Sequence, residues 1–382
     1  MIMGFETIAK SESELWVRYA DLFPVRKHLI YLNHAAVTPL CRPAAEAMAR
    51  LSADAMEYGS LHYDEWLAAY EGLRVAAARL MGATRDEIAL VKNTSEGIST
   101  VALGIDWRAG DKIVAFREEF PSNYYPWKRL EETGLRVEWL SYTDPLDRID
   151  EACRGARLLA ISFVQYLSGY RAPVEAIGEI CQRRGCLFLV DAIQGLGAFP
   201  LDVRRAHVDA LAADGHKWMM GPEGCAVLFV SQALQDAVRP VEFGWTTVAG
   251  YNDYASRDMA LRRDAGRYEC GTLNTVGCYG LRAAIEMIVG IGVEAIGAAV
   301  QGLGDRIAEG VQAKGYEVLG QRTADTGAGI VSFRKAGMDS NEIVERLRKE
   351  RVTAAARQGW VRSSPHFYIS PGEIERFLEL LP

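Results

Sequence analysis

The 382-residue sequence predicts an α/β protein with a seven-stranded, mostly parallel sheet between layers of helices and a smaller α+β unit toward the C-terminus. Short aliphatic runs alternate with helix-like stretches, which is the pattern of strands joined by crossover helices. Several runs are apolar almost throughout, as strands buried on both faces of a sheet are. The length also exceeds one comfortable hydrophobic core, which favours two domains.

Seven predicted strands lie between about residues 85 and 230. They are EIALVK (87–92), DKIVAFRE (111–118), RVEWLSY (136–142), RLLAISFV (157–164), CLFLVD (186–191), VDALAA (208–213) and CAVLFV (225–230). Helix-like stretches fill the gaps, for example NYYPWKRLEETG after the second run and PVEAIGEICQRRG after the fourth. This alternation predicts a mostly parallel sheet with helices on both faces.

The pattern changes after about residue 280. Residues 281–315 read as a long helix interrupted by glycines, and short strands are expected in YEVLG, GIVSFRK and VTAAARQGWVR. PGEIERFLELL is expected to form a final helix. We therefore predict a large domain at residues 20–265 and a small α+β domain that combines residues 1–19 with 266–382.

Composition and charge exclude several classes of protein. The net charge is −7 and the 43 lysines and arginines are scattered, so no basic stripe for nucleic acid is present. The seven cysteines contain no CxxC pair, which indicates neither a metal site nor a disulfide framework and fits a reducing compartment. The segment 284–300 is too short and too charged to cross a membrane, and the N-terminus is not a secretion signal. We expect a cytoplasmic protein that binds a small molecule.

Two polar motifs follow predicted strands, at the sheet edge where open α/β folds bind ligands. In KNTSEGIST (92–100), Thr94 and Ser95 open a strand-to-helix turn whose hydroxyls and amides suit a phosphate. The same residues would also serve as an ordinary helix cap. In CLFLVDAIQ (186–194), Asp191 ends an apolar strand, and Asp191 and Gln194 could equally cap the next helix.

A third motif, DGHKWMMGPEG (214–224), places a lysine between an apolar run and a tryptophan. Lysine is rarely buried without a partner, although a lysine stem can cover a core while its amine reaches water. His216, Lys217 and the surrounding glycines favour a tight basic loop for an anionic ligand. A phosphate cup, a carboxylate and an amine together match the phosphate, ring nitrogen and aldehyde of pyridoxal 5′-phosphate.

With these motifs the sequence resembles the aminotransferase class V family of fold type I pyridoxal-phosphate enzymes, in the branch of cysteine desulfurases and selenocysteine lyase-like proteins. The resemblance covers nearly the whole chain. It runs through YLNHAAVTPL (31–40), NTSEG (93–97), EEFPSN (118–123), VDAIQ (190–194), DGHK (214–217), GTLNT (271–275) and RQGWVRSSPHFY (357–368). The ordered set is far more specific than any one motif.

The resemblance implies roles for individual residues. Lys217 would bind the cofactor's aldehyde and move the proton on the substrate Cα, and Asp191 would pair with the ring nitrogen. Thr272 would reach the phosphate from a partner subunit, which implies a homodimer with shared sites. The residues implied at the cofactor are Thr94, Ser95, Phe120, Tyr166, Asp191, Gln194, His216, Lys217 and Thr272, and those implied at the substrate are Arg362 and His34.

The sequence departs from the desulfurase pattern at several positions. Phe120 stands where desulfurases have histidine, Tyr166 where they have asparagine, and Asp214 where a small hydroxyl residue is usual. We expect Asp214 to turn away from the phosphate and to orient His216. Desulfurases carry a nucleophilic cysteine on a loop after an R-x-G segment, but here R-Q-G (357–359) leads directly to Trp360, and no cysteine follows Cys278.

The first expectation for function is therefore an enzyme that uses pyridoxal 5′-phosphate at the α-amino group of an amino acid, nominally an aminotransferase. The alternatives are a C–S or other β-eliminating lyase, or an epimerase, that uses the same lysine without a loop cysteine. A cofactor-binding protein without turnover is a further alternative. It is disfavoured because the lysine, aspartate and arginine are all present and no basic helix-turn-helix segment is attached.

Overall fold

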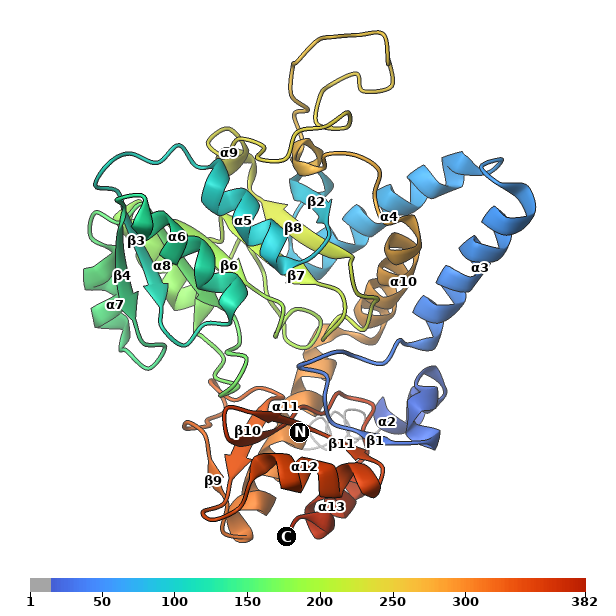
Figure 1. The fold of residues 1–382 in the computed structure, drawn as a ribbon, viewed down its shortest axis with the longest axis vertical. Coiled ribbons are helices and arrows are strands. Elements are labelled where there is room, and N and C mark those ends of the chain that lie inside the picture. The colour runs from blue at the N-terminus through green and yellow to red at the C-terminus, as the bar shows by residue number, and fades with distance from the viewer. Residues whose placement is uncertain (1–14) are drawn as a thin grey trace, which may run out of the picture.

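A computed structural model describes residues 15–382, and Figure 1 shows a large sheet-based part above a smaller α+β part. The predicted contribution of residues 1–14 to the small domain lies outside the described residues. The predicted division of the chain into residues 20–265 and the remainder stays a prediction.

The large sheet confirms all seven predicted strands, in the order β2-β8-β7-β6-β5-β3-β4. The strands are β2 (Ile88–Val91), β3 (Lys112–Phe116), β4 (Arg136–Leu140), β5 (Leu158–Ser162), β6 (Leu187–Asp191), β7 (Ala210–Asp214) and β8 (Ala226–Val230). β8 is antiparallel to both of its neighbours, and the other pairs are parallel. The sheet is therefore mostly parallel, as predicted.

Helices cover both faces of this sheet, because alternate residues of a strand point to opposite faces. In β3, Ile113 and Ala115 enter one hydrophobic core with residues of α5 and α6, while Val114 and Phe116 enter a second core with residues of α4, α7, α8 and α10. The helices of the large part are α3 (Arg42–Tyr58), α4 (Tyr63–Met81), α5 (Thr94–Gly104), α6 (Tyr125–Glu132), α7 (Leu146–Cys153), α8 (Val174–Arg184), α9 (Gln232–Gln235) and α10 (Thr275–Ile291).

The small part contains a four-stranded antiparallel sheet in the order β12-β13-β10-β9. Its elements are α11 (Val293–Ala313), β9 (Glu317–Val318), β10 (Val331–Arg334), α12 (Ser340–Lys349), β11 (Val352–Thr353), β12 (Ala355–Arg357), β13 (Trp360–Ser363) and α13 (Pro371–Leu380). The segment VTAAARQGWVR, expected as one strand, forms three, and α12 is an additional helix. Asp339 is the N-cap of α12, and its side chain accepts a hydrogen bond from the Asn341 N–H.

Short elements at the N-terminal side join the two parts of the chain. They are α2 (Leu15–Arg18), β1 (Ile30–Tyr31) and the 3₁₀ turns at Ala20–Leu22 and Pro24–Lys27, and further 3₁₀ turns lie at Arg85–Glu87, Pro121–Asn123 and Ala265–Tyr268. β1 pairs in parallel with β11, so residues early in the chain lie beside the C-terminal segment. Figure 1 shows β1 and β11 next to each other in the smaller part, near α2.

The predicted long helix at 281–315 is two helices, α10 and α11, that meet at 86°. Gly292 between them has a φ of +98°, a conformation that glycine adopts without the steric cost of a side chain. Among residues 15–382, no single helix is long and apolar enough to cross a membrane, and only this bent pair reaches the required length and composition together.

Candidate active site

Lys217 lies just beyond the carboxyl end of β7, in a loop that glycines allow to close tightly. Gly215 donates its N–H to the Cys225 carbonyl at 3.0 Å, and Gly221 donates to the Gly215 carbonyl at 2.9 Å. A Cβ on Gly215 would lie 2.7 Å from a Leu281 methyl carbon, so only glycine fits there without movement. The loop therefore holds Lys217 in an inward position, where the residue is 8% exposed.

Burial changes the acid–base behaviour of the Lys217 amine. Burial lowers the pKa to about 8, even though the Asp191 carboxylate opposes this shift, and the nearby Arg362 cation contributes to the lowering. Lys217 Nζ lies 5.5 Å from the centroid of the Phe120 ring. An amine with this pKa is partly neutral near pH 7 and can act as a nucleophile or a base.

Asp191 ends β6, the strand next to β7, so its side chain lies at the same sheet edge as Lys217. It is 2% exposed and accepts a hydrogen bond from the Ile193 N–H at 3.1 Å. Burial raises its pKa to about 6, and the Lys217 charge works in the opposite direction. A buried carboxylate in this position can hold a protonated ring nitrogen.

Gln194 is fixed by two hydrogen bonds. Its Nε2 donates to the Ala35 carbonyl at 3.0 Å, and its Oε1 accepts from the Trp218 indole N–H at 2.9 Å. Because an amide nitrogen carries two hydrogens, one donor on Nε2 is left for a ligand. Trp218, the residue next to Lys217, is therefore a structural support for Gln194.

The predicted phosphate residues lie around the N-terminus of α5. Asn93 is the N-cap and accepts from the Glu96 N–H at 2.9 Å, so Thr94 is the first helical residue and not the cap. The Thr94 hydroxyl accepts from the Asp214 N–H at 3.0 Å and keeps its own hydrogen to donate. Ser95 is exposed, and its hydroxyl lies 2.7 Å from that of Ser122.

Asp214 and His216 face each other across the β7 loop. His216 Nδ1 lies 2.8 Å from Asp214 Oδ1, although the two groups are poorly aligned for a hydrogen bond. The close approach matches the expectation that Asp214 orients His216. Because Nδ1 of His216 faces Asp214, the other ring nitrogen, Nε2, is left to face a ligand.

Arg362 on β13 is a buried cation without an anionic partner in the described chain. It is 3% exposed, Nη1 donates to the Tyr166 carbonyl at 2.8 Å, and the buried Nε has no partner there. Burial and the neighbouring Arg357 lower its pKa to about 10. Because a buried unpaired charge is costly, this guanidinium suits the carboxylate of a ligand.

Phe120 and Tyr166 form an aromatic wall beside Lys217, with ring centroids 5.3 Å apart at 74°. The Tyr166 hydroxyl accepts from Gln358 Nε2 at 2.6 Å. Beyond Tyr166 lies a hollow of about 520 Å³, whose lining includes Arg117, Glu118, Tyr142 and Gln358.

Two predicted site residues do not join this cluster. His34 is fully buried, and its ring nitrogens lie 2.8 Å from the Ser364 carbonyl and 2.7 Å from the Tyr368 hydroxyl, so neither is left for a substrate. Thr272 is exposed and lines a separate hollow with Lys92 and Glu96. A contribution of Thr272 to a partner's site stays a prediction.

Glu119 is a buried residue of the site that the motifs did not identify. Its carboxylate accepts from the Ser162 N–H at 2.7 Å, from the Ser162 hydroxyl, and from Gln165 Nε2 at 2.9 Å. Ser162 pairs with Asp191 across β5 and β6, and burial together with the Asp191 charge raises the pKa of Glu119 to about 7. Glu119 lies in the motif EEFPSN, which could have indicated a role in the site. Two adjacent glutamates are, however, more typical of an exposed surface segment.

The described residues fit pyridoxal 5′-phosphate. A buried amine and a buried carboxylate, each close enough to shift the other's pKa, lie at one sheet edge with no side-chain partner of their own. The amine of Lys217 could hold the aldehyde, Asp191 the ring nitrogen, and the α5 N-terminus with Thr94, Ser95 and His216 the phosphate.

Comparisons with known proteins agree with this fit. The model of the family described as aminotransferase class-V matches residues 30–367. A probable cysteine desulfurase from Pyrococcus abyssi is 32% identical, with 94% of each chain covered, and an uncharacterised aminotransferase of Bacillus subtilis, YcbU, is 28% identical, with 95% of this chain and 96% of YcbU covered. The apo structure of a cysteine desulfurase from Thermococcus onnurineus NA1 superposes with a TM-score of 0.86 at 30% identity, covering 93% of this chain and 96% of that one.

Proposed function

This chain belongs to the aminotransferase class-V family, whose members are pyridoxal-phosphate enzymes of fold type I, and we propose that it is a lyase that breaks the C–S bond of a cysteine-type amino acid. One observation carries the proposal. The Lys217 amine, the Asp191 carboxylate and the Arg362 guanidinium, which has no anionic partner among the described residues, meet in a chain that aligns over nearly its whole length with proteins named as cysteine desulfurases.

The cofactor supplies an electron sink that stabilises negative charge at the substrate Cα. Arg362 would bind the substrate carboxylate through its free Nε edge and orient the Cα–H bond toward Lys217. Lys217 would take the proton from Cα, because its pKa of about 8 leaves a usable fraction of neutral amine. Asp191 would keep the ring nitrogen protonated, and the Phe120–Tyr166 wall would exclude water from one side.

The C-terminal hairpin favours elimination over transfer of sulfur to a protein thiol. β12 and β13 are joined by Gln358 and Gly359 alone, with φ values of 50° and 79°. This two-residue turn replaces the cysteine loop expected of a desulfurase. The sulfur would therefore leave directly. Cysteine and water would yield pyruvate, ammonia and hydrogen sulfide, and cystine and water would yield pyruvate, ammonia and cysteine persulfide.

Aminotransferase activity, the first expectation from the sequence, is the second candidate. The YcbU relative, named as an uncharacterised aminotransferase, supports it. The relatives named as desulfurases favour chemistry at sulfur, so we place the lyase first.

We also propose a homodimer. The loop 241–262 projects from the large part (Figure 1) and carries exposed Phe243, Trp245 and Tyr254. Trp245 and Tyr251 line a hollow with α4 and the segment 271–273, which includes Thr272. An apolar projection beside Thr272 suits a partner subunit, whose site Thr272 would then complete. The cytoplasmic location stays a prediction, as does the absence of nucleic-acid and membrane partners.

Product analysis tests the lyase proposal. The cofactor-loaded protein is incubated with L-cysteine and, separately, with L-cystine, and pyruvate, ammonia and alanine are measured. We expect equal amounts of pyruvate and ammonia, and none with the Lys217→Ala variant. Alanine in place of pyruvate would contradict elimination, a pyridoxamine form that needs a keto-acid acceptor would indicate transamination, and loss of chirality at Cα without ammonia would indicate an epimerase.

A further inference from the structure

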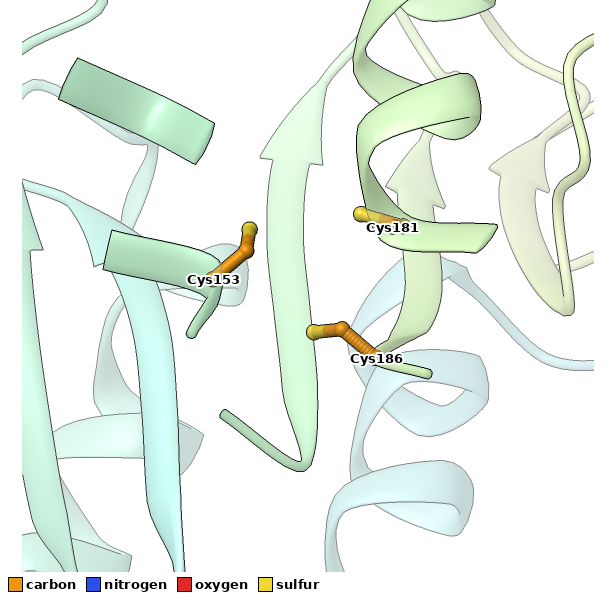
Figure 2. Close-up of side chains that lie close together, drawn as sticks. All are labelled: Cys153, Cys181 and Cys186. Carbon is orange, nitrogen blue, oxygen red and sulfur yellow. The ribbon is translucent and has the colours of Figure 1, made fainter. Parts of the chain in front are cut away.

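Three buried cysteines from separate positions in the chain meet beneath the surface of the large part. The sulfurs of Cys153, Cys181 and Cys186 all lie within 4.8 Å of one another. Figure 2 shows them pointing into one space from the end of α7, the last part of α8 and the start of the chain into β6. The exposed fractions are 0%, 1% and 5%, so all three belong to the protein interior.

Local backbone geometry places two of these thiols together. α8 ends at Arg184, and the C-cap residue Gly185 takes the left-handed conformation and reverses the chain. The Cys186 N–H then donates to the Cys181 carbonyl at 2.9 Å. α7 packs against α8 and adds Cys153 from its last residue.

This cluster is separate from the Lys217 site. Cys186 precedes β6, and Asp191 ends the same strand. Five residues of extended chain span about 16 Å, so the thiols lie at the opposite end of the strand from the proposed cofactor site. Neither the cofactor nor the substrate needs them.

The spacing suits a metal ion bound by three sulfurs. A metal with sulfur ligands at about 2.3 Å in a trigonal arrangement places the sulfurs about 4.0 Å apart, inside the observed limit of 4.8 Å. Structural zinc sites and iron–sulfur clusters use four ligands, and the group found among the described residues contains only these three. Thiolates select the cuprous ion, zinc and iron–sulfur clusters, and of these only the cuprous ion is left once four-ligand sites are set aside.

We propose that Cys153, Cys181 and Cys186 form a three-coordinate thiolate site for a soft monovalent metal ion, with the cuprous ion as the fitting occupant. Binding exchanges three S–H bonds for three metal–sulfur bonds and releases three protons, and no electron is transferred. The site is structural and ties the end of α7 to the end of α8.

The surroundings of the cluster allow access for an ion. Arg154 and Gly185, the chain neighbours of Cys153 and Cys186, are exposed. The cluster therefore lies beside exposed chain, from which an ion would approach.

Anaerobic titration of the cofactor-loaded, full-length protein tests the site. Cuprous ion is supplied as its acetonitrile complex, and a chromophoric chelator competes for it. We expect one equivalent to be retained per chain, and X-ray absorption of that sample to show three sulfur neighbours. The variants Cys153→Ser and Cys181→Ser should lose the equivalent. Cys270→Ser, which changes an exposed cysteine outside the cluster, should keep it.

The X-ray absorption spectrum of the wild type tests the proposal even if a variant of a buried cysteine fails to fold, because it counts the sulfur neighbours of the bound ion. Two sulfur neighbours, as the Cys225–Cys278 pair with sulfurs 3.9 Å apart would provide, would overturn the proposal. Failure of the wild type to retain any ion against the chelator would overturn it too. So would loss of the ion in Cys270→Ser, or its retention in a folded Cys153→Ser variant.

Discussion

Replacing Arg362 separates binding of the substrate from binding of the cofactor. The side chain donates to the Tyr166 carbonyl through Nη1, while its buried Nε is left without a partner among the described residues. Arg362→Met keeps much of the buried volume and removes the charge and every donor. Arg362→Lys keeps the charge but not the planar fork that matches a carboxylate, so it serves as the conservative control.

The size of the effect follows from the free edge of the guanidinium. Two charge-assisted hydrogen bonds to a carboxylate contribute about 1.5–3 kcal/mol each, or about 3–6 kcal/mol together. At about 1.4 kcal/mol for each factor of ten, Arg362→Met should lower kcat/KM for L-cysteine by about 10²- to 10⁴-fold. The kcat/KM of Arg362→Lys for L-cysteine should lie between that of Arg362→Met and that of the wild type.

Pyruvate release at varied L-cysteine gives kcat/KM, and the visible absorbance of the bound cofactor gives occupancy. We expect occupancy to be unchanged in both variants. Cysteamine, which lacks the carboxylate, should react equally with the wild type and with Arg362→Met. The reasoning is refuted if Arg362→Met lowers kcat/KM for L-cysteine by less than about tenfold, since a charged contact to the carboxylate contributes more than that. It is also refuted if the reaction rate with cysteamine falls in Arg362→Met as much as the rate with L-cysteine.

Three further predictions concern neighbouring groups. The rate at which the cofactor attaches to the apo-protein should rise with pH, reach half of its maximum near pH 8 and level off above about pH 9, because burial lowers the pKa of Lys217 to about 8 and only the neutral amine attacks; a rate still rising at about pH 10, as for a free lysine, would contradict this. Asp191→Asn should keep the cofactor bound but lower kcat by about 10- to 100-fold, since a charge-assisted bond of about 1.5–3 kcal/mol is lost, and an unchanged kcat would exclude the ring-nitrogen role. Arg74→Ala should lower the free energy of unfolding by about 3–5 kcal/mol, because it removes the cation in direct contact with the buried Glu269 and leaves only Arg262, at 4.0 Å, whereas the exposed Arg129→Ala should cost less than about 1 kcal/mol in the same denaturant titration.

Much of the site could be predicted because parallel strands end at one edge of a sheet. Asp191 and Lys217 follow neighbouring strands, so their strand-end positions in the sequence were enough to predict that they would meet. Thr94 could be assigned to the same edge because β2 precedes α5 there. These contacts depend on local pattern and on topology, and both can be read from the order of the motifs.

Other features depend on packing between distant segments. His34 lies in a family motif, yet its ring nitrogens are taken by Ser364 and Tyr368, more than three hundred residues away. The proposed substrate site therefore does not include His34. The cysteine spacing contains no metal motif, because the cluster forms only when α7 packs on α8 and Gly185 reverses the chain. A glycine such as Gly292 also does not reveal from the sequence alone whether a helix tolerates it or bends there.

The assignment of Lys217 as the residue that binds the cofactor is tested most directly by reductive trapping. The holo-protein is treated with borohydride, digested, and analysed by mass spectrometry for the lysine that carries the reduced pyridoxyl group. The geometry of the β7 loop predicts the label on Lys217 alone and no label in Lys217→Ala. A label on another lysine, or one that persists in Lys217→Ala, would contradict the proposed site.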